Sequence, residues 1–200
     1  VSMGIVDIAI GTETNGSISC PSSINGIVGM KPTIGLVSRS GIIPISSSQD
    51  TAGPMGATVD IVAKTLEVIA GYDENDPATS SIPTNFDFNF SSATNNISLR
   101  GIRLGLLNSK NSNPQVIELH KKLQEIVNSL GGELILIDDD RDYPGDAESF
   151  VLLYEFRVGL EEYLKNANSS MKKLTDIIDF NKANKDLSLI HISEPTRPNN

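Results

Sequence analysis

The chain of 200 residues carries 25 acidic and 16 basic side chains, a formal net charge of −9, and 38% of its residues are hydrophobic. This hydrophobic content is enough for a buried core, whereas the negative charge disfavours direct binding to the phosphates of nucleic acid. One cysteine and two histidines exclude an internal disulfide framework and a zinc site, and no apolar run reaches the length of a membrane span.

The N-terminal part of the chain predicts a strand followed by ordered loops. The first residues, VSMGIVDIAIGTET, have neither the basic start nor the cleavage site of a signal peptide and are typical of sequence from the middle of a domain. Residues 5–10 form a β-branched run that ends at Gly11, which indicates a buried strand leading into a loop. Residues 11–56 are rich in Gly, Ser, Thr and Pro but also in Ile and Val, so we expect ordered loops and short strands over a sheet.

A helical pattern follows this loop-rich region. Thr58 occupies an N-cap position, and Gly71 ends the helix that it opens. Residues 77–100 show little periodicity and predict a long surface connection. The apolar face of the helix contains Val59, Val62, Ala63, Leu66, Ile69 and Ala70.

The C-terminal half indicates an α/β fold. Residues 102–107 and 134–137 predict two strands, and between them Pro114 opens a helix that Gly131 and Gly132 end. This succession predicts a βαβ unit with parallel strands. Residues 147–167 and 171–184 predict two more helices. The buried faces are predicted to contain Val116, Ile117, Leu123, Ile126, Val127 and Leu130 in the first of the three helices, Phe150, Leu153, Tyr154 and Leu160 in the second, and Leu174, Ile177 and Ile178 in the third.

The end of the chain, LSLIHISEPTRPNN, breaks the helical pattern abruptly. It resembles translated sequencing-adapter sequence, and residues 187–200 are predicted to be a non-native or disordered tail. The alternative is a natural, unstructured C-terminus. His191 is therefore given no role.

The segment GTETNGS, residues 11–17, has the residue types that acyl transfer needs. Asn and Gly tolerate positive φ, so successive backbone N–H groups can converge on one point. Beside a serine hydroxyl, such donors stabilise the oxyanion that develops when Ser17 attacks a carbonyl. Small-residue turns that end in serine are common, however, and the motif alone favours a purely structural turn.

The base that would activate Ser17 is not evident in the chain. His120 lies within the helix that Pro114 opens and is predicted to be a helix-surface or boundary residue. The nucleophile-elbow pattern G-x-S-x-G is absent. A Ser-His-Asp mechanism finds no support, which leaves a lysine base or a base outside this stretch.

Residues 11–59 carry several motifs in succession: GTETNGS, NGIVGMKPT, VSRSG and QDTAGPM. In this order they resemble the core of the amidase signature enzymes, and a weaker similarity continues over essentially all of residues 1–186. The resemblance implies an α/β amidase signature fold, with a mixed β-sheet core covered by α-helices. Residues 1–186 would be an internal part of a single domain. VSRSGIIPIS and SQDTAGPM are most similar to bacterial peptide amidases.

The resemblance also assigns catalytic roles. Ser17 matches the nucleophile, the backbone amides of Thr14, Asn15, Gly16 and Ser17 match the oxyanion hole, and Thr12 matches a hydroxyl that supports the proton relay. The lysine and the cis-peptide serine of the family's Ser-cisSer-Lys mechanism belong to segments that precede this strand. The chain alone is therefore expected to be inactive.

The implied function is hydrolysis of a carboxamide, a small molecule or a peptide amide, with release of ammonia and without a cofactor or metal. One alternative is the A subunit of a tRNA-dependent amidotransferase, which would need partner subunits. Another is a non-catalytic relative. No membrane partner is expected, and the sequence does not indicate a cellular location.

Structural roles are predicted for several residues near the motif. Lys31 is expected to hold the loop in place rather than act as the base, and nothing basic near Cys20 would lower its pKa for nucleophilic attack. Many relatives carry an arginine where this chain has Ser19 and Cys20, so no guanidinium pairs there with a substrate carboxylate or with Glu13. The absence of that charge favours a neutral or peptide-like substrate.

Charged residues further along the chain are interpreted in the same way. Arg39, Gln49 and Asp50 could line a cleft, but side chains of this kind in loop-rich cores usually bind backbone groups. The acidic stretch 138–140 with Asp142 lacks the glycine and glutamate of a calcium loop and predicts a solvated turn.

Overall fold

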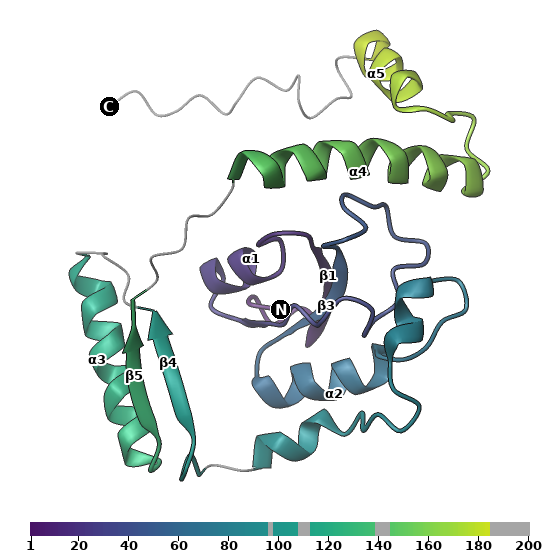
Figure 1. Ribbon diagram of the computed structural model, residues 1–200. Helices are drawn as coiled ribbons and strands as arrows, with labels where there is room; N and C mark the ends of the chain where they lie inside the picture. The colour runs from purple at the N-terminus through teal and green to yellow at the C-terminus, as the bar shows by residue number, and fades with distance from the viewer. Residues whose placement is uncertain (96–97, 108–112, 139–144, 185–200) are drawn as a thin grey trace. The chain divides into compact units, whose positions relative to one another are not determined.

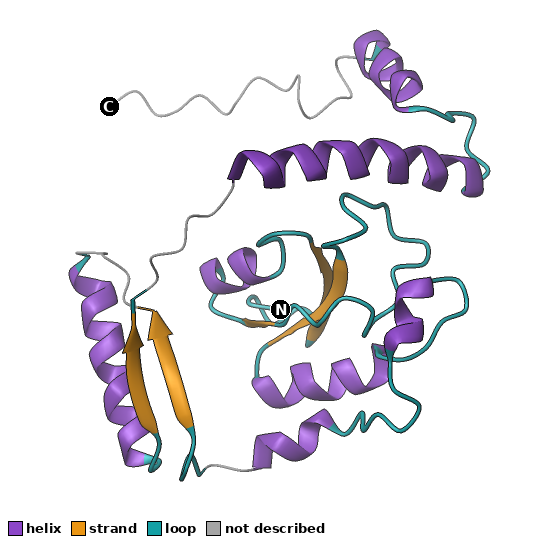
Figure 2. Ribbon diagram, in the orientation of Figure 1, coloured by secondary structure: helices purple, strands orange, loops and turns teal. Residues whose placement is uncertain are grey.

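The computed structural model describes residues 1–95, 98–107, 113–138 and 145–184 (Figure 1). The chain divides into two compact units, one formed by residues 1–86 with residues from 145 onward and the other by residues 87–144. Helices and strands alternate along the chain (Figure 2), which confirms the predicted α/β class. The assignment of residues 1–186 to a single domain stays a prediction.

An antiparallel sheet of three strands forms the centre of the first unit. The strand order is β1-β3-β2, with β1 at Ile8–Glu13, β2 at Val28–Gly29 and β3 at Thr51–Gly56. The register pairs Ile8 with Gly56 and Glu13 with Thr51.

The observed β1 differs from the strand predicted at residues 5–10. It begins three residues later and continues to Glu13, because its ladder with β3 extends that far. The predicted burial is wrong, since Ile8 and Ile10 are 43% and 52% exposed. Within the described residues β1 pairs only with β3, so it forms an edge of the sheet.

The middle strand β3 is buried and requires close packing. Thr51, Ala52, Gly53 and Pro54 are all buried. A Cβ atom at Gly53 would lie 2.1 Å from the carbonyl oxygen of Met30 and 2.8 Å from Cδ of Pro32. Only glycine lets the backbone that follows β2 approach the strand this closely.

Two helices accompany the sheet in this part of the chain. The short α1, Ser19–Ile24, follows β1, and α2, Val59–Ile69, contacts β3. Thr58 caps α2 by accepting a hydrogen bond from the amide of Ile61 at 3.3 Å, which confirms the predicted N-cap. The buried apolar residues of α2 are Val62, Ala63 and Leu66, whereas Val59, which was expected on this face, is exposed.

The segment after α2 was predicted to be a surface connection, and it contains two 3₁₀ turns. The first, η1, spans Pro77–Ser81, and the second, η2, spans Phe90–Asn95. Asp76 caps η1, since its side chain accepts from the amide of Ala78 at 3.2 Å. The connection is therefore ordered locally at both turns.

The second unit contains the predicted βαβ motif. Strands β4, Arg103–Leu107, and β5, Glu133–Ile137, are parallel, and α3, Pro114–Ser129, joins them and contacts β5. Gly131, at φ +82°, follows the end of α3. Val127 is buried as predicted, but Ile117, Leu123 and Ile126 are exposed, because a sheet of two strands covers only a narrow face of the helix.

Two helices complete the first unit. They are α4, Gly145–Asn166, and α5, Leu174–Ala183. Leu160 of α4 is buried as predicted, but the predicted burial of Phe150, Leu153 and Tyr154 is wrong, since these side chains are 66–72% exposed. The reason is that α4 contacts residues 15 and 44–48 through the face that carries Glu148, Glu155 and Gly159 instead. Among the described helices, none combines the length and the apolar character needed to cross a membrane.

We predict that Gly53→Ala lowers the free energy of unfolding by about 3 kcal/mol or more, because the new methyl group would overlap a backbone carbonyl that cannot move aside. Urea denaturation of the full-length protein measures the change. Gly145→Ala is the matched control, since a Cβ there meets nothing within 4 Å, and it should leave stability unchanged or slightly raised. Equal stability of the two variants would contradict the packing described here.

Candidate active site

Ser17 lies in the loop that joins the end of β1 to α1. Its side chain is exposed, and it forms no hydrogen bond with any described residue. Gly16, which precedes it, has φ +93°, a left-handed conformation that reverses the chain at low steric cost only for glycine. The loop therefore presents the Ser17 hydroxyl to solvent.

The buried carboxylate of Glu13 holds this loop from inside. Oε1 accepts from the amide of Gly16 at 2.8 Å, and Oε2 accepts from the amides of Ile18 and Ser19, both at 2.9 Å. The hydroxyl of Ser19 donates to Oε1 at 3.2 Å. Among the described residues no guanidinium contacts Glu13, whose carboxylate is satisfied by backbone amides and one hydroxyl.

These donors set the protonation state of Glu13. Burial is the largest single effect and acts to raise its pKa, but the hydrogen bonds from the amides of Ser19, Gly16 and Ile18 together outweigh it. The pKa of Glu13 is lowered as a result. The side chain stays ionised while it is buried.

The amides predicted to form the oxyanion hole differ in whether they already have a hydrogen-bond acceptor. The amide of Gly16 is already bound to Glu13. The amides of Asn15 and Ser17, by contrast, have no acceptor within the described part of the chain. Two N–H groups that flank Gly16 are therefore free to bind a ligand.

Three further interactions fix the start of the loop. Lys31 donates from Nζ to the carbonyl oxygen of Thr14 at 2.6 Å, which confirms its predicted structural role. The hydroxyl of Thr14 donates to Oδ1 of Asp50 at 2.5 Å. From α4, Glu148 accepts a hydrogen bond of 2.6 Å from the side-chain amide of Asn15.

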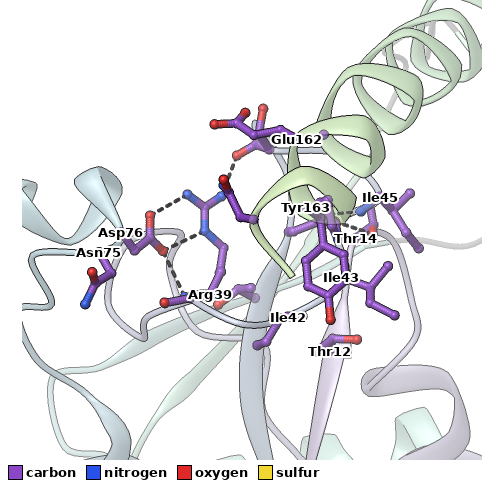
Figure 3. A pocket seen from close by; sticks show the side chains of 17 residues that line it. Thr12, Thr14, Arg39, Ile42, Ile43, Ile45, Asn75, Asp76, Glu162 and Tyr163 are labelled. Atoms are coloured by element: carbon purple, nitrogen blue, oxygen red, sulfur yellow. Dashed lines mark hydrogen bonds and ion pairs between the residues drawn. The ribbon is translucent and has the colours of Figure 1, made fainter. Parts of the chain in front are cut away.

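A pocket of about 240 Å³ lies next to this loop (Figure 3). Thr12 and Thr14 line it from the end of β1, and Glu162 and Tyr163 line it from α4. Ser17 is not among its lining residues. The structure thus brings Thr12 and Thr14 together at the pocket and leaves Ser17 on the exposed side of the same loop.

Arg39 and Asp50 line the pocket and also bind backbone groups, as predicted. Arg39 donates to both carboxylate oxygens of Asp76 at 2.9 Å and to the carbonyl oxygen of Ser47 at 2.6 Å. Asp50 accepts from the amides of Ile45 and Ser46 at 2.7 and 2.8 Å. Gln49 does not line the pocket, and its side chain donates to Ser46 at 3.3 Å.

The ion pair of Arg39 and Asp76 lowers the pKa of the Asp76 carboxyl group. The hydrogen bond from Arg39 is the main reason that the pKa of Asp76 falls from its ordinary value of 3.8 to about 2, while burial opposes the change. Side-chain exposures of 19% for Arg39 and 6% for Asp76 show that solvent screens the pair weakly.

Sequence reasoning missed the contribution of α4 to the site. Glu162 and Tyr163 lie more than 140 residues after Thr14 and follow no recognisable motif. Helical periodicity marks a face of α4 but not the loop against which that face packs. A likeness to a complete structure would have been the only available signal.

The remaining candidates have no catalytic environment in the structure. His120 is half-buried in α3, as expected for a boundary position, and Cys20 is an exposed free thiol. Across the described ranges, no three His, Cys, Asp or Glu side chains are grouped to hold a metal ion. Residues 139–142, His191 and the predicted tail at 187–200 lie outside the described residues.

We predict that Glu13→Gln lowers the free energy of unfolding by about 2 kcal/mol, because the new NH₂ group faces backbone donors and leaves at least one of them unpaired. Hydrogen exchange at the amides of Gly16, Ile18 and Ser19 should become faster in the same variant. Ser19→Ala, which removes only the hydroxyl donor, is the control and should cost less than about 1 kcal/mol. Unchanged protection of the Gly16 amide would contradict the described role of Glu13.

We predict that Asp76→Asn lowers the free energy of unfolding by about 2 kcal/mol at pH 7. Because the folded-state pKa is depressed, the stabilisation is fully present above about pH 4 and is lost as the pH falls from 3.8 towards 2. Denaturation of variant and wild type at pH 7, 4 and 2.5 should therefore show a difference that is nearly constant between pH 7 and 4 and is reduced by more than half at pH 2.5. Asp60→Asn, which removes an exposed pair with Lys64, is the control and should change stability much less than Asp76→Asn at pH 7.

Sequence comparisons agree with the motifs in the loop. Residues 1–191 match the family described as Amidase. A probable amidase of Arabidopsis thaliana is 35% identical over 192 residues, which cover 91% of this chain and 36% of the relative. The A subunit of the glutamyl-tRNA(Gln) amidotransferase of Synechococcus sp. is 37% identical over 155 residues, 76% of this chain and 31% of the relative.

Solved structures share the fold. The peptide amidase from Stenotrophomonas maltophilia aligns with a TM-score of 0.84 at 41% identity, covering 94% of this chain and 39% of that chain. The A subunit of the glutamyl-tRNA(Gln) amidotransferase from Thermotoga maritima aligns with a TM-score of 0.60 at 26% identity, covering 92% and 39%. The chain thus spans well under half the length of each relative.

Proposed function

The chain belongs to the amidase signature family, and from this premise we propose that it is part of an amide hydrolase whose nucleophile is Ser17. One observation carries the proposal. The exposed Ser17 hydroxyl lies on a loop where the amides of Asn15 and Ser17 have no acceptor among the described residues, while Glu13 and Lys31 hold the backbone around them.

In the proposed reaction, Oγ of Ser17 attacks the carbonyl carbon of a carboxamide. The carbonyl oxygen becomes an oxyanion, which accepts hydrogen bonds from the amides of Ser17 and Asn15. The C–N bond then breaks, the nitrogen takes up a proton and leaves as ammonia, and an acyl ester remains on Ser17. Attack by water on this ester releases the carboxylic acid and restores the hydroxyl.

The proton of Ser17 needs an acceptor, and no described residue forms a hydrogen bond with the Ser17 hydroxyl. By resemblance to the family, that acceptor is a lysine acting through a second serine with a cis peptide bond, both in segments that precede β1. The exposed hydroxyl of Thr12 would support this relay from the end of β1. Activity is therefore a property of the full-length protein.

The position of Gly16 suggests a role different from direct oxyanion binding. Its amide is engaged by Glu13, so it stabilises the loop, and the amides on either side of it have no acceptor among the described residues. Thr14 is held at its carbonyl oxygen by Lys31 and at its hydroxyl by Asp50, and neither contact involves its amide. The amides of Ser17 and Asn15, which have no acceptor among the described residues, are the donors that we expect to act on the substrate.

A peptide amide is the substrate that we favour. The likeness to a peptide amidase supports it. So does the lack of a cation at the two positions after Ile18, because Ser19 and Cys20 provide no positive charge for a substrate carboxylate. Charge near the nucleophile therefore does not select an acidic amide.

Relatives named as the A subunit of an amidotransferase support a second candidate. Such a protein would pass ammonia to a partner instead of releasing it, and it would form a stable complex. Gel filtration of the full-length protein, combined with assay of ammonia release from peptide amides, separates the two functions. A single chain that releases ammonia favours the hydrolase, whereas a stable heteromeric complex favours the amidotransferase. The intact loop around Ser17 argues against a non-catalytic relative.

We predict that Ser17→Ala in the full-length protein lowers amide hydrolysis by at least about 10³-fold, because no other group in the loop can form the acyl ester. Ammonia release measures the rate, and circular dichroism should show an unchanged fold, since the side chain is exposed. Cys20→Ser, at a second exposed position, is the control and should retain activity. Full activity of Ser17→Ala would remove Ser17 from the nucleophile's role.

A further inference from the structure

The pocket beside the nucleophile loop has one apolar wall. Ile42, Ile43, Pro44 and Ile45 form it, and Tyr163 of α4 lines the pocket as well (Figure 3). Ile43 and Ile45 are 59% and 46% exposed, so apolar surface remains open to a ligand. A volume of about 240 Å³ suits one side chain rather than a whole drug-sized molecule.

The wall and α4 approach each other closely. A Cβ atom at Gly159 of α4 would lie 3.0 Å from Cγ of Pro44. The carboxylate of Glu155, one turn earlier, accepts from the hydroxyls of Ser46 and Ser48 at 2.5 and 2.9 Å. These contacts hold Glu162 and Tyr163 beside the apolar wall.

The charges that line the pocket are unbalanced. Three carboxylates, Asp50, Asp76 and Glu162, face one guanidinium, that of Arg39, which gives a formal charge of −2. Arg39 forms an ion pair with Asp76. Asp50 already accepts hydrogen bonds from one hydroxyl and two backbone amides. Glu162 is exposed and forms no hydrogen bond or ion pair with any described residue. It is the carboxylate that remains available to a ligand.

We propose that this pocket is the subsite for a substrate side chain with an alkyl stem that ends in an ammonium or guanidinium group. The stem lies against Ile43 and Pro44, and the cation binds the carboxylate of Glu162 and the ring of Tyr163. The inference rests on the proposed hydrolase function and narrows its substrate to carboxamides of peptides that contain a lysine-like or arginine-like residue.

The position of the pocket connects it to the reaction. Thr14 lines the pocket and precedes Ser17 by three residues, a chain length that spans at most about 11 Å. Asp50 holds both the Thr14 hydroxyl and the amides of Ile45 and Ser46. One carboxylate thus fixes the nucleophile loop and the apolar wall relative to each other, as a specificity subsite requires.

The test compares two dipeptide amides that differ only at one residue, lysine in one and the uncharged norleucine in the other. The full-length wild type should hydrolyse the lysine amide with a kcat/KM about three- to tenfold higher, as expected for one exposed ion pair and one cation–π contact. Glu162→Gln should reduce this ratio to about one. Glu161→Gln, the same charge change at the preceding residue of α4, does not touch the pocket and should keep the ratio. Raising the salt concentration to about 0.5 M should lower the lysine-to-norleucine ratio of kcat/KM in the wild type, because salt screens an exposed ion pair.

A lysine-to-norleucine ratio that Glu162→Gln leaves unchanged, or that Glu161→Gln reduces equally, overturns the proposal. Isothermal titration of Nα-acetyl-lysinamide into Ser17→Ala separates this failure from failure of the proposed function. If no amide is hydrolysed but the probe binds more weakly after Glu162→Gln is added, the subsite stands and the hydrolase assignment falls. If the norleucine amide is hydrolysed and the probe binds equally with and without Glu162, the subsite falls and the hydrolase assignment stands.

Discussion

The buried carboxylate of Glu13 is the interaction on which the nucleophile loop depends. It ends β1 and accepts hydrogen bonds from the amides of Gly16, Ile18 and Ser19, so a turn and the start of α1 are fixed by one side chain. Leaving the buried amide of Ile18 unpaired would cost about 1–3 kcal/mol. Ser17 lies between two residues whose amides point inward to Glu13. Its own amide and hydroxyl therefore have no partner inside the loop, and this leaves them available to a substrate.

A second carboxylate couples this loop to the pocket. Asp50 accepts from the hydroxyl of Thr14 on one side and from the amides of Ile45 and Ser46 on the other. Arg39 binds Asp76 and the carbonyl oxygen of Ser47, which fixes the same wall from the far end. Because each contact uses a charged side chain, and several of these side chains bind backbone groups, the loops keep one conformation without regular secondary structure. The long loop-rich segment of the sequence is thus ordered by side chains rather than by strands.

Features that depend on local chemistry could be predicted from the sequence. Thr58 and Pro114 mark helix starts because capping and a fixed φ act within one turn, and the strand–helix–strand succession specifies parallel pairing of β4 and β5. Exposure could not be predicted in the same way. An apolar residue such as Ile10 or Phe150 is buried only if another segment covers it, and periodicity does not say which segment does so. The glycine at position 53 shows the same limit. A larger residue is excluded there by the carbonyl oxygen of Met30, which lies 23 residues earlier in the sequence.

The active-site motif shows most clearly what a pattern can and cannot specify. GTETNGS indicates a loop of convergent N–H groups, but it does not tell which of them bind Glu13 and which remain free, because that division depends on the φ of Gly16. The division has a consequence for catalysis. The pKa of Glu13 lies below its ordinary value, so the carboxylate that shapes the loop does not change charge near neutral pH. Glu13 therefore gives the loop no reason to change its hydrogen bonds near neutral pH. Under the proposed function, a change in turnover with pH near neutrality is expected from the groups that carry the proton to and from Ser17 rather than from Glu13.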